Sequence, residues 1–111
     1  MKNIFTYTNF RTYLKDYYRK GKKENPEFSH RWIVRQLGLS TSNYFLSIME
    51  GRRNLPGNVS LRLTRLLGLN KTETLYFEYM VAFLQSKTKF EKDEYFSRMA
   101  ALNPRLRKKG R

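Results

Sequence analysis

The sequence predicts an all-α fold, a compact bundle of about five to six helices. Apolar residues recur at helical spacing along most of the chain, residues typical of helix starts and stops separate these stretches, and no strand-like alternation or internal repeat is visible. The 111 residues, 40% hydrophobic and 15% aromatic, suffice for one helical core. We therefore expect a single helical domain over residues 1–104 and a flexible basic tail over residues 105–111.

The first helix is expected from Thr8 to Lys20, because its apolar residues fall on one helical face. These residues are Phe10, Tyr13, Leu14 and Tyr17. Residues 21–27 contain Gly21 and Pro26 and therefore predict a loop. We interpret the first helix as scaffolding for the segment that follows it.

Residues 28–53 predict two short helices joined by a turn of about three residues, which is the pattern of a helix-turn-helix. Ser29 can cap the first helix, and Gly38 can end it in a left-handed conformation at no steric cost. Ser40 or Thr41 can cap the second helix, which Gly51 closes. The buried faces are expected to hold Ile33, Val34 and Leu37 in the first helix and Phe45, Ile48 and Met49 in the second.

A fourth helix is expected over residues 58–67, and a fifth opens with the capping-box spacing of Asn70 and Glu73 and runs to about Ser86. Apolar residues cover more of the circumference of the fifth helix than a single apolar stripe would. Such a helix is either deeply buried or faces a partner. The candidate dimer or partner surface consists of Tyr76, Tyr79 and Phe83.

A sixth helix is expected from Thr88, whose spacing to Glu91 repeats the capping signature. Its apolar residues are Tyr95, Phe96, Met99 and Leu102. The Asn103-Pro104 pair ends this helix, because proline cannot continue it. The remaining residues show no periodicity, which favours the flexible tail.

Basic residues dominate the charge, since 23 Lys and Arg against 9 Asp and Glu give a formal net charge of +14. Residues 1–57 hold 11 basic and 4 acidic groups, residues 58–104 hold 7 and 5, and residues 105–111 hold 5 and none. Most of the excess positive charge therefore lies in residues 1–57, which contain the helix-turn-helix, and in the tail. This asymmetry predicts a polyanionic partner rather than a merely soluble surface.

Residue types that the sequence lacks exclude several kinds of site. Without cysteine there is no disulfide or thiolate chemistry, and the single histidine, His30, cannot form a His-based metal cluster. No Gly-rich phosphate loop, Cys-His pair or carboxylate cluster near the histidine is present, so we expect no enzyme activity and no cofactor. No window approaches the roughly 18 apolar residues of a membrane span, and we expect a cytoplasmic protein without a membrane partner.

Residues 8–70 resemble the Cro and lambda-repressor-like helix-turn-helix domains of bacterial and phage regulators. The resemblance rests on the spacing from Ser29 to Gly38-Leu39, on the exit loop Gly51-Arg52-Arg53-Asn54, and on an apolar helix ending in Leu-Gly-Leu. From Gly38 to Gly51 the chain is one residue longer than the repressor-like pattern, so the second helix aligns from Ser40 or from Thr41.

A narrower resemblance involves the segments IFTYTNFRTYLKDYY, FSHRWIVRQLGLS, EGRRNL and LNKTETLYF. They are similar to the front end of a bacterial family of regulators that usually continue into a C-terminal domain of unknown function. This resemblance implies that the chain is a fragment or a short member, and that a missing C-terminal domain is a candidate partner.

The repressor-like resemblance implies that the second helix lies in the major groove of DNA with its N-terminal residues at base edges. An Asn amide can bond adenine with both ends, hydroxyl groups can reach several bases, and a Leu can touch the thymine methyl. The candidate base contacts are Thr41, Ser42, Asn43, Leu46 and Ser47. The candidate phosphate contacts are His30, Arg31, Ser40, Arg52, Arg53 and Asn54.

The leading hypothesis is therefore a bacterial transcriptional regulator that binds double-stranded DNA in a sequence-specific manner, often as a homodimer. One alternative is a protein-interaction or dimerisation module of a longer regulator, in which the fifth and sixth helices form the interface and DNA affinity is incidental. Another is a basic RNA-binding protein, which the tail suggests.

Overall fold

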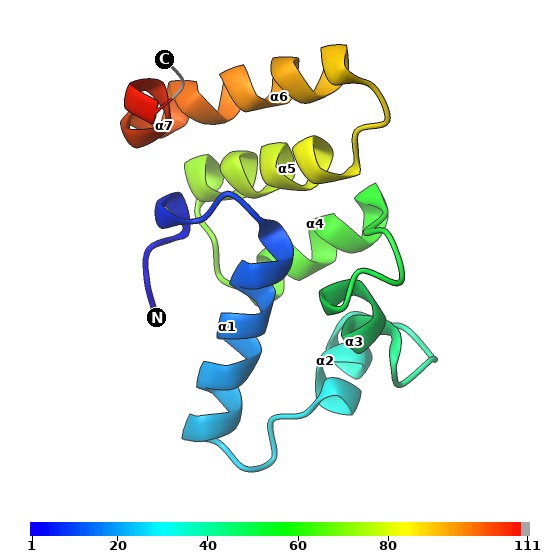
Figure 1. The fold of residues 1–111 in the computed structure, drawn as a ribbon. Coiled ribbons are helices and arrows are strands. Elements are labelled where there is room, and N and C mark those ends of the chain that lie inside the picture. The colour runs from blue at the N-terminus through cyan, green and yellow to red at the C-terminus, as the bar shows by residue number, and fades with distance from the viewer. Residues whose placement is uncertain (110–111) are drawn as a thin grey trace. The chain divides into compact units, whose positions relative to one another are not determined.

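The computed structural model describes the backbone of residues 1–109 and the side chains of residues 1–106. All regular structure in this part of the chain is helical, which confirms the predicted all-α class (Figure 1). A short 3-10 turn, η1 (Ile4–Thr6), precedes the α-helices described over residues 1–109. Their bounds are α1 (Phe10–Glu24), α2 (His30–Gln36), α3 (Tyr44–Met49), α4 (Gly57–Leu66), α5 (Lys71–Gln85), α6 (Lys89–Leu102) and α7 (Pro104–Lys109).

The chain divides into two compact units. The first unit consists of Met1 and Arg11–Gly68, and it contains most of α1 together with α2, α3 and α4. The second unit consists of Lys2–Phe10 and Leu69–Arg111, and it contains η1, α5, α6 and α7. The boundary at Gly68 falls inside the segment that the sequence predicts as one domain, and each unit is described by itself below.

Helix α1 continues beyond its predicted end at Lys20, through Gly21 to Glu24, so the predicted loop at residues 21–24 is wrong. Gly21 stays helical because the ring of Phe28 packs against its backbone, and a Cβ atom there would lie 2.5 Å from that ring. Lys20 and Glu24 also form an ion pair at 2.6 Å, one helical turn apart. A tertiary contact thus extends the helix past its glycine.

Helix α2 begins and ends as the sequence predicts. The Ser29 hydroxyl accepts a hydrogen bond from the Trp32 amide at 3.1 Å, and Gly38 follows the helix with a φ of +73°. Arg62 of α4 donates from Nη1 to the Leu37 carbonyl at 2.9 Å. This bond satisfies a carbonyl at the end of α2, where the helix has no partner of its own.

Helix α3 begins later than predicted, at Tyr44 rather than at Ser40 or Thr41. The N-cap position belongs to Asn43, whose side chain makes no capping hydrogen bond. Residues 40–43 are all exposed, so no apolar side chain among them holds another helical turn against the core. The residues between Gly38 and Tyr44 instead form a long turn, and the predicted three-residue turn is wrong.

The C-terminal end of α3 is held by α1. Arg11 donates from Nη1 to the carbonyl of Ile48 and, at 3.1 Å, to the carbonyl of Arg53. Burial lowers the pKa of Arg11, although the guanidinium stays charged at neutral pH. Gly51 follows with a φ of +83° and ends the helix, as the sequence predicts. Arg11 thereby ties the exit loop to the scaffold.

In the second unit, α5 and α6 lie side by side (Figure 1), and both begin with the predicted caps. The Asn70 side chain accepts from the Glu73 amide at 2.8 Å, and the Glu73 carboxylate accepts from the Asn70 amide at 2.9 Å. The Thr88 hydroxyl accepts from the Glu91 amide at 3.1 Å. Local side-chain chemistry therefore sets both helix starts.

The predicted partner surface on α5 is partly covered within the second unit, since Tyr76 is buried and Tyr79 and Phe83 are half-buried. Tyr76 is fully buried, the Tyr79 ring lies 6.4 Å from that of Tyr95, and the Phe83 ring lies 5.9 Å from that of Phe96. The wide apolar girth of α5 thus reflects deep burial, which is the other outcome that the sequence pattern allowed. Tyr76 therefore cannot contact a partner in this conformation, whereas Tyr79 and Phe83 are only half-buried, so their assignment to a dimer or partner surface stays a prediction.

The tail predicted from Arg105 is helical over residues 104–109. Pro104 suits the first position of a helix, because its φ is fixed and it needs no amide partner there. The Asn103 side chain accepts from the Arg105 amide at 3.2 Å, and Leu106 is buried. The prediction of an irregular tail is therefore wrong for residues 105–109, and residues 110–111 lie outside the described residues.

Candidate nucleic-acid interface

The turn before α3 presents an exposed polar segment. Thr41, Ser42 and Asn43 are all exposed, and the Tyr44 amide bonds to the Thr41 carbonyl at 3.1 Å. These three candidate base contacts are thus accessible, but a turn carries them rather than the first turn of a helix. Their positions depend on the conformation of this turn.

A hollow of about 350 Å³ lies beside this turn, and we call it the α2 hollow. It is lined by Arg31, Val34, Arg35, Leu39, Ser40 and Ser42. Helix α2 places Arg31 and Arg35 one turn apart on its exposed side, while the buried Val34 fixes the orientation of the helix. Two arginines and two serines therefore line one depression.

Arg35 is absent from the phosphate contacts that the sequence analysis proposes. The four-residue spacing from Arg31 could have identified it, since residues so spaced share a helical face. Neither arginine forms an ion pair with a carboxylate in residues 1–106. Both charges are therefore available to an anionic partner.

The exit loop after α3 carries Arg52, Arg53 and Asn54, and all three are exposed. Arg52 pairs with Glu50 and places Nη2 3.5 Å from the Ser47 hydroxyl. The Arg53 guanidinium lies over the Tyr44 ring, 4.5 Å from its centre. Side chains of α3 and its C-cap thus hold both arginines close to the motif.

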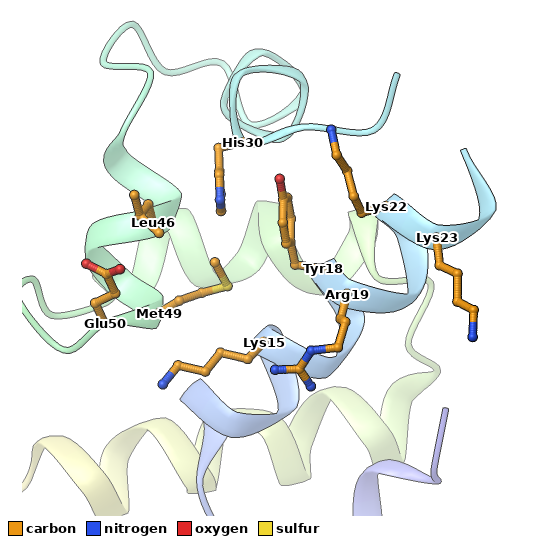
Figure 2. A pocket seen from close by; sticks show the side chains of 9 residues that line it. All are labelled: Lys15, Tyr18, Arg19, Lys22, Lys23, His30, Leu46, Met49 and Glu50. Atoms are coloured by element: carbon orange, nitrogen blue, oxygen red, sulfur yellow. The ribbon is translucent and has the colours of Figure 1, made fainter. Parts of the chain in front are cut away.

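His30 and Leu46 line a different hollow, between α1 and α3, with a volume of about 520 Å³ (Figure 2). The His30 ring stacks on that of Tyr18, with centroids 4.0 Å apart and planes inclined by 8°. The structure therefore separates these two candidate contacts from Arg31, Ser40 and Ser42.

The wall of this second hollow contributed by α1 is basic, and we call the hollow the basic pocket. Its cations are Lys15, Arg19, Lys22 and Lys23. The sequence predicts α1 as scaffolding only, because that prediction rests on the apolar face of the helix. The spacing of Lys15, Arg19 and Lys22, at four and then three residues, is the signal that places these three on one face of the helix.

The imidazole of His30 favours its neutral form. Burial lowers the pKa of His30, the Glu50 carboxylate opposes this effect, and the Lys22 charge adds to it. The Nδ1 atom is buried and has no hydrogen-bond partner in the described residues. Protonating His30 would therefore place a charge where solvation is poor.

We expect the free energy of unfolding to fall as pH drops below 6.5, the ordinary pKa of histidine. The unfolded chain then binds the proton before the folded chain does, so stability is lost progressively toward the lower pKa of the folded state. Thermal unfolding of the wild type and of His30→Gln between pH 5 and pH 8 measures this contribution. The wild type should lose more stability than the variant in this window. A constant difference across the window would contradict the expectation.

Comparison with models of known families, with curated proteins and with solved structures gives no significant match to this chain. The resemblance to repressor-like domains therefore stays a prediction from the residues. Among the described residues, no group of three or more His, Cys, Asp or Glu is placed to hold a metal ion. No described helix combines the length and apolarity needed to cross a membrane.

Proposed function

We propose that this chain binds double-stranded DNA through α2, the turn and α3, and that it acts as a transcriptional regulator in the bacterial cytoplasm. One observation carries the proposal. Arg31 and Arg35 line the α2 hollow together with Ser40 and Ser42, directly beside the exposed turn. A phosphate group of a DNA strand fits this combination of charge and hydroxyl donors.

The chemistry of the α2 hollow suits a phosphate diester. A guanidinium presents several N–H donors in a plane, and two oxygens of one phosphate can accept from it together. The hydroxyls of Ser40 and Ser42, which also line the hollow, can supply further donors. Contacts of this kind position a protein on DNA without reading its sequence.

Base reading is assigned to the residues next to these phosphate contacts. Thr41 and Asn43, which flank Ser42, are exposed and polar, and the Asn43 side chain makes no capping bond that would occupy its amide. An Asn amide can pair with adenine through two hydrogen bonds. Asn43 is accordingly the first residue to test for sequence preference.

The exit loop supplies a second set of backbone contacts. Arg53 is exposed but held against Tyr44, and its carbonyl is bound by Arg11. A guanidinium held in this way loses less conformational entropy on binding than one on a free side chain. Arg52 contributes less, because its charge is already paired with Glu50.

Selection from a random duplex pool, followed by fluorescence anisotropy at several salt concentrations, tests the proposal. We expect one sequence family to be preferred over bulk DNA by a factor of about 10³ or more, with affinity falling steeply as salt rises. Asn43→Ala should change the preferred sequence while leaving bulk DNA affinity nearly unchanged. Equal affinity for every duplex at fixed salt would contradict sequence-specific binding, and tighter binding to RNA of the same length would favour the RNA-binding alternative.

A further inference from the structure

The basic pocket is a second concave site that the proposed DNA contacts do not use. Helices α1, α2 and α3 of the first unit all contribute to it (Figure 2). Its volume of about 520 Å³ lies within the range of roughly 300–1,000 Å³ that is usual for ligand pockets. A small organic molecule is therefore the size of ligand that the pocket can take.

One wall of the basic pocket is apolar and partly aromatic. It consists of the stacked rings of Tyr18 and His30, with Leu46 and Met49 on the α3 side (Figure 2). The neutral form of His30 adds a flat ring to this wall rather than a charge. A planar ring of a ligand can pack here and gain the free energy of apolar burial and ring contact.

The α1 side of the pocket, which supplies Tyr18, also carries cations, and these are poorly neutralised. Arg19 pairs with Asp16 at 2.9 Å, and Lys22 donates to the Pro26 carbonyl at 3.3 Å. Lys15 and Lys23 have no ion-pair partner in residues 1–106. Like charges this close on a helix repel each other, and a bound anion relieves the repulsion.

The lining also contains a carboxylate, Glu50, but this group is paired with Arg52. It therefore contributes little to neutralising the α1 cations across the pocket. Repulsion from Glu50 also favours placing an anion at the α1 side, near Lys22 and Lys23, rather than at the α3 side. The pocket thus offers cations along α1 and an apolar lining that runs from Tyr18 and His30 to Leu46 and Met49.

We propose that the basic pocket binds a small organic phosphate that carries a planar ring, a ligand of nucleotide size. Its phosphates contact Arg19, Lys22 and Lys23, and its ring packs against Tyr18, Leu46 and Met49. A duplex does not match this arrangement, because its bases are stacked and paired inside and only sugar and phosphate reach a recessed apolar wall. The inference stands apart from the proposed function, since ligand binding is measured without any DNA.

Titration of the isotope-labelled full chain with ADP, inorganic pyrophosphate and adenosine, followed by NMR, tests this site. We expect ADP to bind at least about tenfold more tightly than either fragment, because each fragment satisfies only one wall. The largest chemical-shift changes on ADP binding should occur at Tyr18, Leu46 and Met49. No ADP binding at millimolar concentration, or pyrophosphate binding as tightly as ADP, would overturn the proposal.

Two variants separate the walls of the pocket. Lys22→Gln with Lys23→Gln should weaken ADP binding at least about tenfold, since two charge-assisted contacts are lost. The matched control, Lys71→Gln with Lys87→Gln, removes the same charge outside the pocket and should change ADP binding less than about twofold. Circular dichroism verifies that both double variants fold. If both lose ADP affinity equally, the attraction is nonspecific and the proposed site is wrong.

Leu46→Gln tests the apolar wall with the cations intact. It should weaken ADP binding several-fold while leaving pyrophosphate binding unchanged, because only the ring contacts Leu46 in the proposed arrangement. Leu46 is half-buried, so its replacement is compatible with folding more readily than that of a core residue. Unchanged ADP affinity in this variant would overturn the assignment of the ring to this wall.

Discussion

Replacing Arg31 and Arg35 together by Gln should lower the affinity for duplex DNA by about 100-fold at low salt, since a hydrogen bond to a charged group contributes about 1.5–3 kcal/mol. Both side chains are exposed and line the α2 hollow, so their removal opens no cavity in the core. The slope of log affinity against log salt should become shallower by about 2, because two fewer counterions are released. Anisotropy titrations of the selected duplex at four or more salt concentrations measure both quantities.

The matched control for this variant removes two exposed cations of the second unit, Lys71→Gln with Lys87→Gln. It lowers the net charge equally, so any affinity loss that it shares with the arginine variant reflects the overall charge. We expect a loss of less than about fivefold for the control. If both variants lose affinity alike, DNA binding is diffuse and the α2 hollow has no special role in it.

Helix boundaries set by local side-chain bonds were predictable from the sequence. Ser29, Asn70 and Thr88 each accept from an amide three residues ahead, and this chemistry is visible in the residue types and their spacing. The ends at Gly38 and Gly51 follow equally from the tolerance of glycine for positive φ. These features involve only neighbours in the chain.

Boundaries that depend on distant contacts were not predictable. The extension of α1 past Gly21 requires the Phe28 ring against its backbone, and glycine alone indicates the opposite. Pro104 was interpreted as a break, although the bonds around Asn103 make it the first residue of α7. The late start of α3 arises because residues 40–43 find no apolar anchor, which the caps at Ser40 and Thr41 do not reveal.

The candidate site was predictable only in part, because some of its contacts involve neighbours in the chain and others involve a different helix. Arg31 and Ser40 were predicted to contact phosphate and Ser42 to contact a base, and all three line the α2 hollow. Leu46 and His30 lie on the other side because Tyr18 of α1 stacks on His30 and draws that ring into the basic pocket. The helical periodicity of α2 and α3 does not show where α1 packs. The separation of His30 and Leu46 from Arg31, Ser40 and Ser42 could therefore not be predicted without the tertiary structure.

Asn103→Ala should reduce the free energy of unfolding of the second unit by about 3 kcal/mol, because it leaves several buried polar groups unpaired. The Asn103 amide nitrogen donates to the Phe5 carbonyl at 2.6 Å and to the Tyr76 hydroxyl at 3.1 Å, and the side-chain oxygen caps α7. The residue is only 4% exposed, so water does not readily replace these bonds. Urea unfolding followed by far-ultraviolet circular dichroism measures the loss.

Tyr76→Phe and Asn54→Ala are reference variants for the loss of unfolding free energy in Asn103→Ala. Tyr76 donates to the Tyr7 carbonyl at 2.5 Å, and burial raises the pKa of its phenol, so the hydroxyl stays a donor. Its removal keeps the ring and should cost about 1–2 kcal/mol. Asn54 is exposed, and its replacement should change stability by less than about 0.5 kcal/mol. If Asn103→Ala is no more destabilising than Asn54→Ala, the polar cluster does not hold η1, α5 and α7 together, and the apolar contacts of Tyr76 with Phe5 must be sufficient.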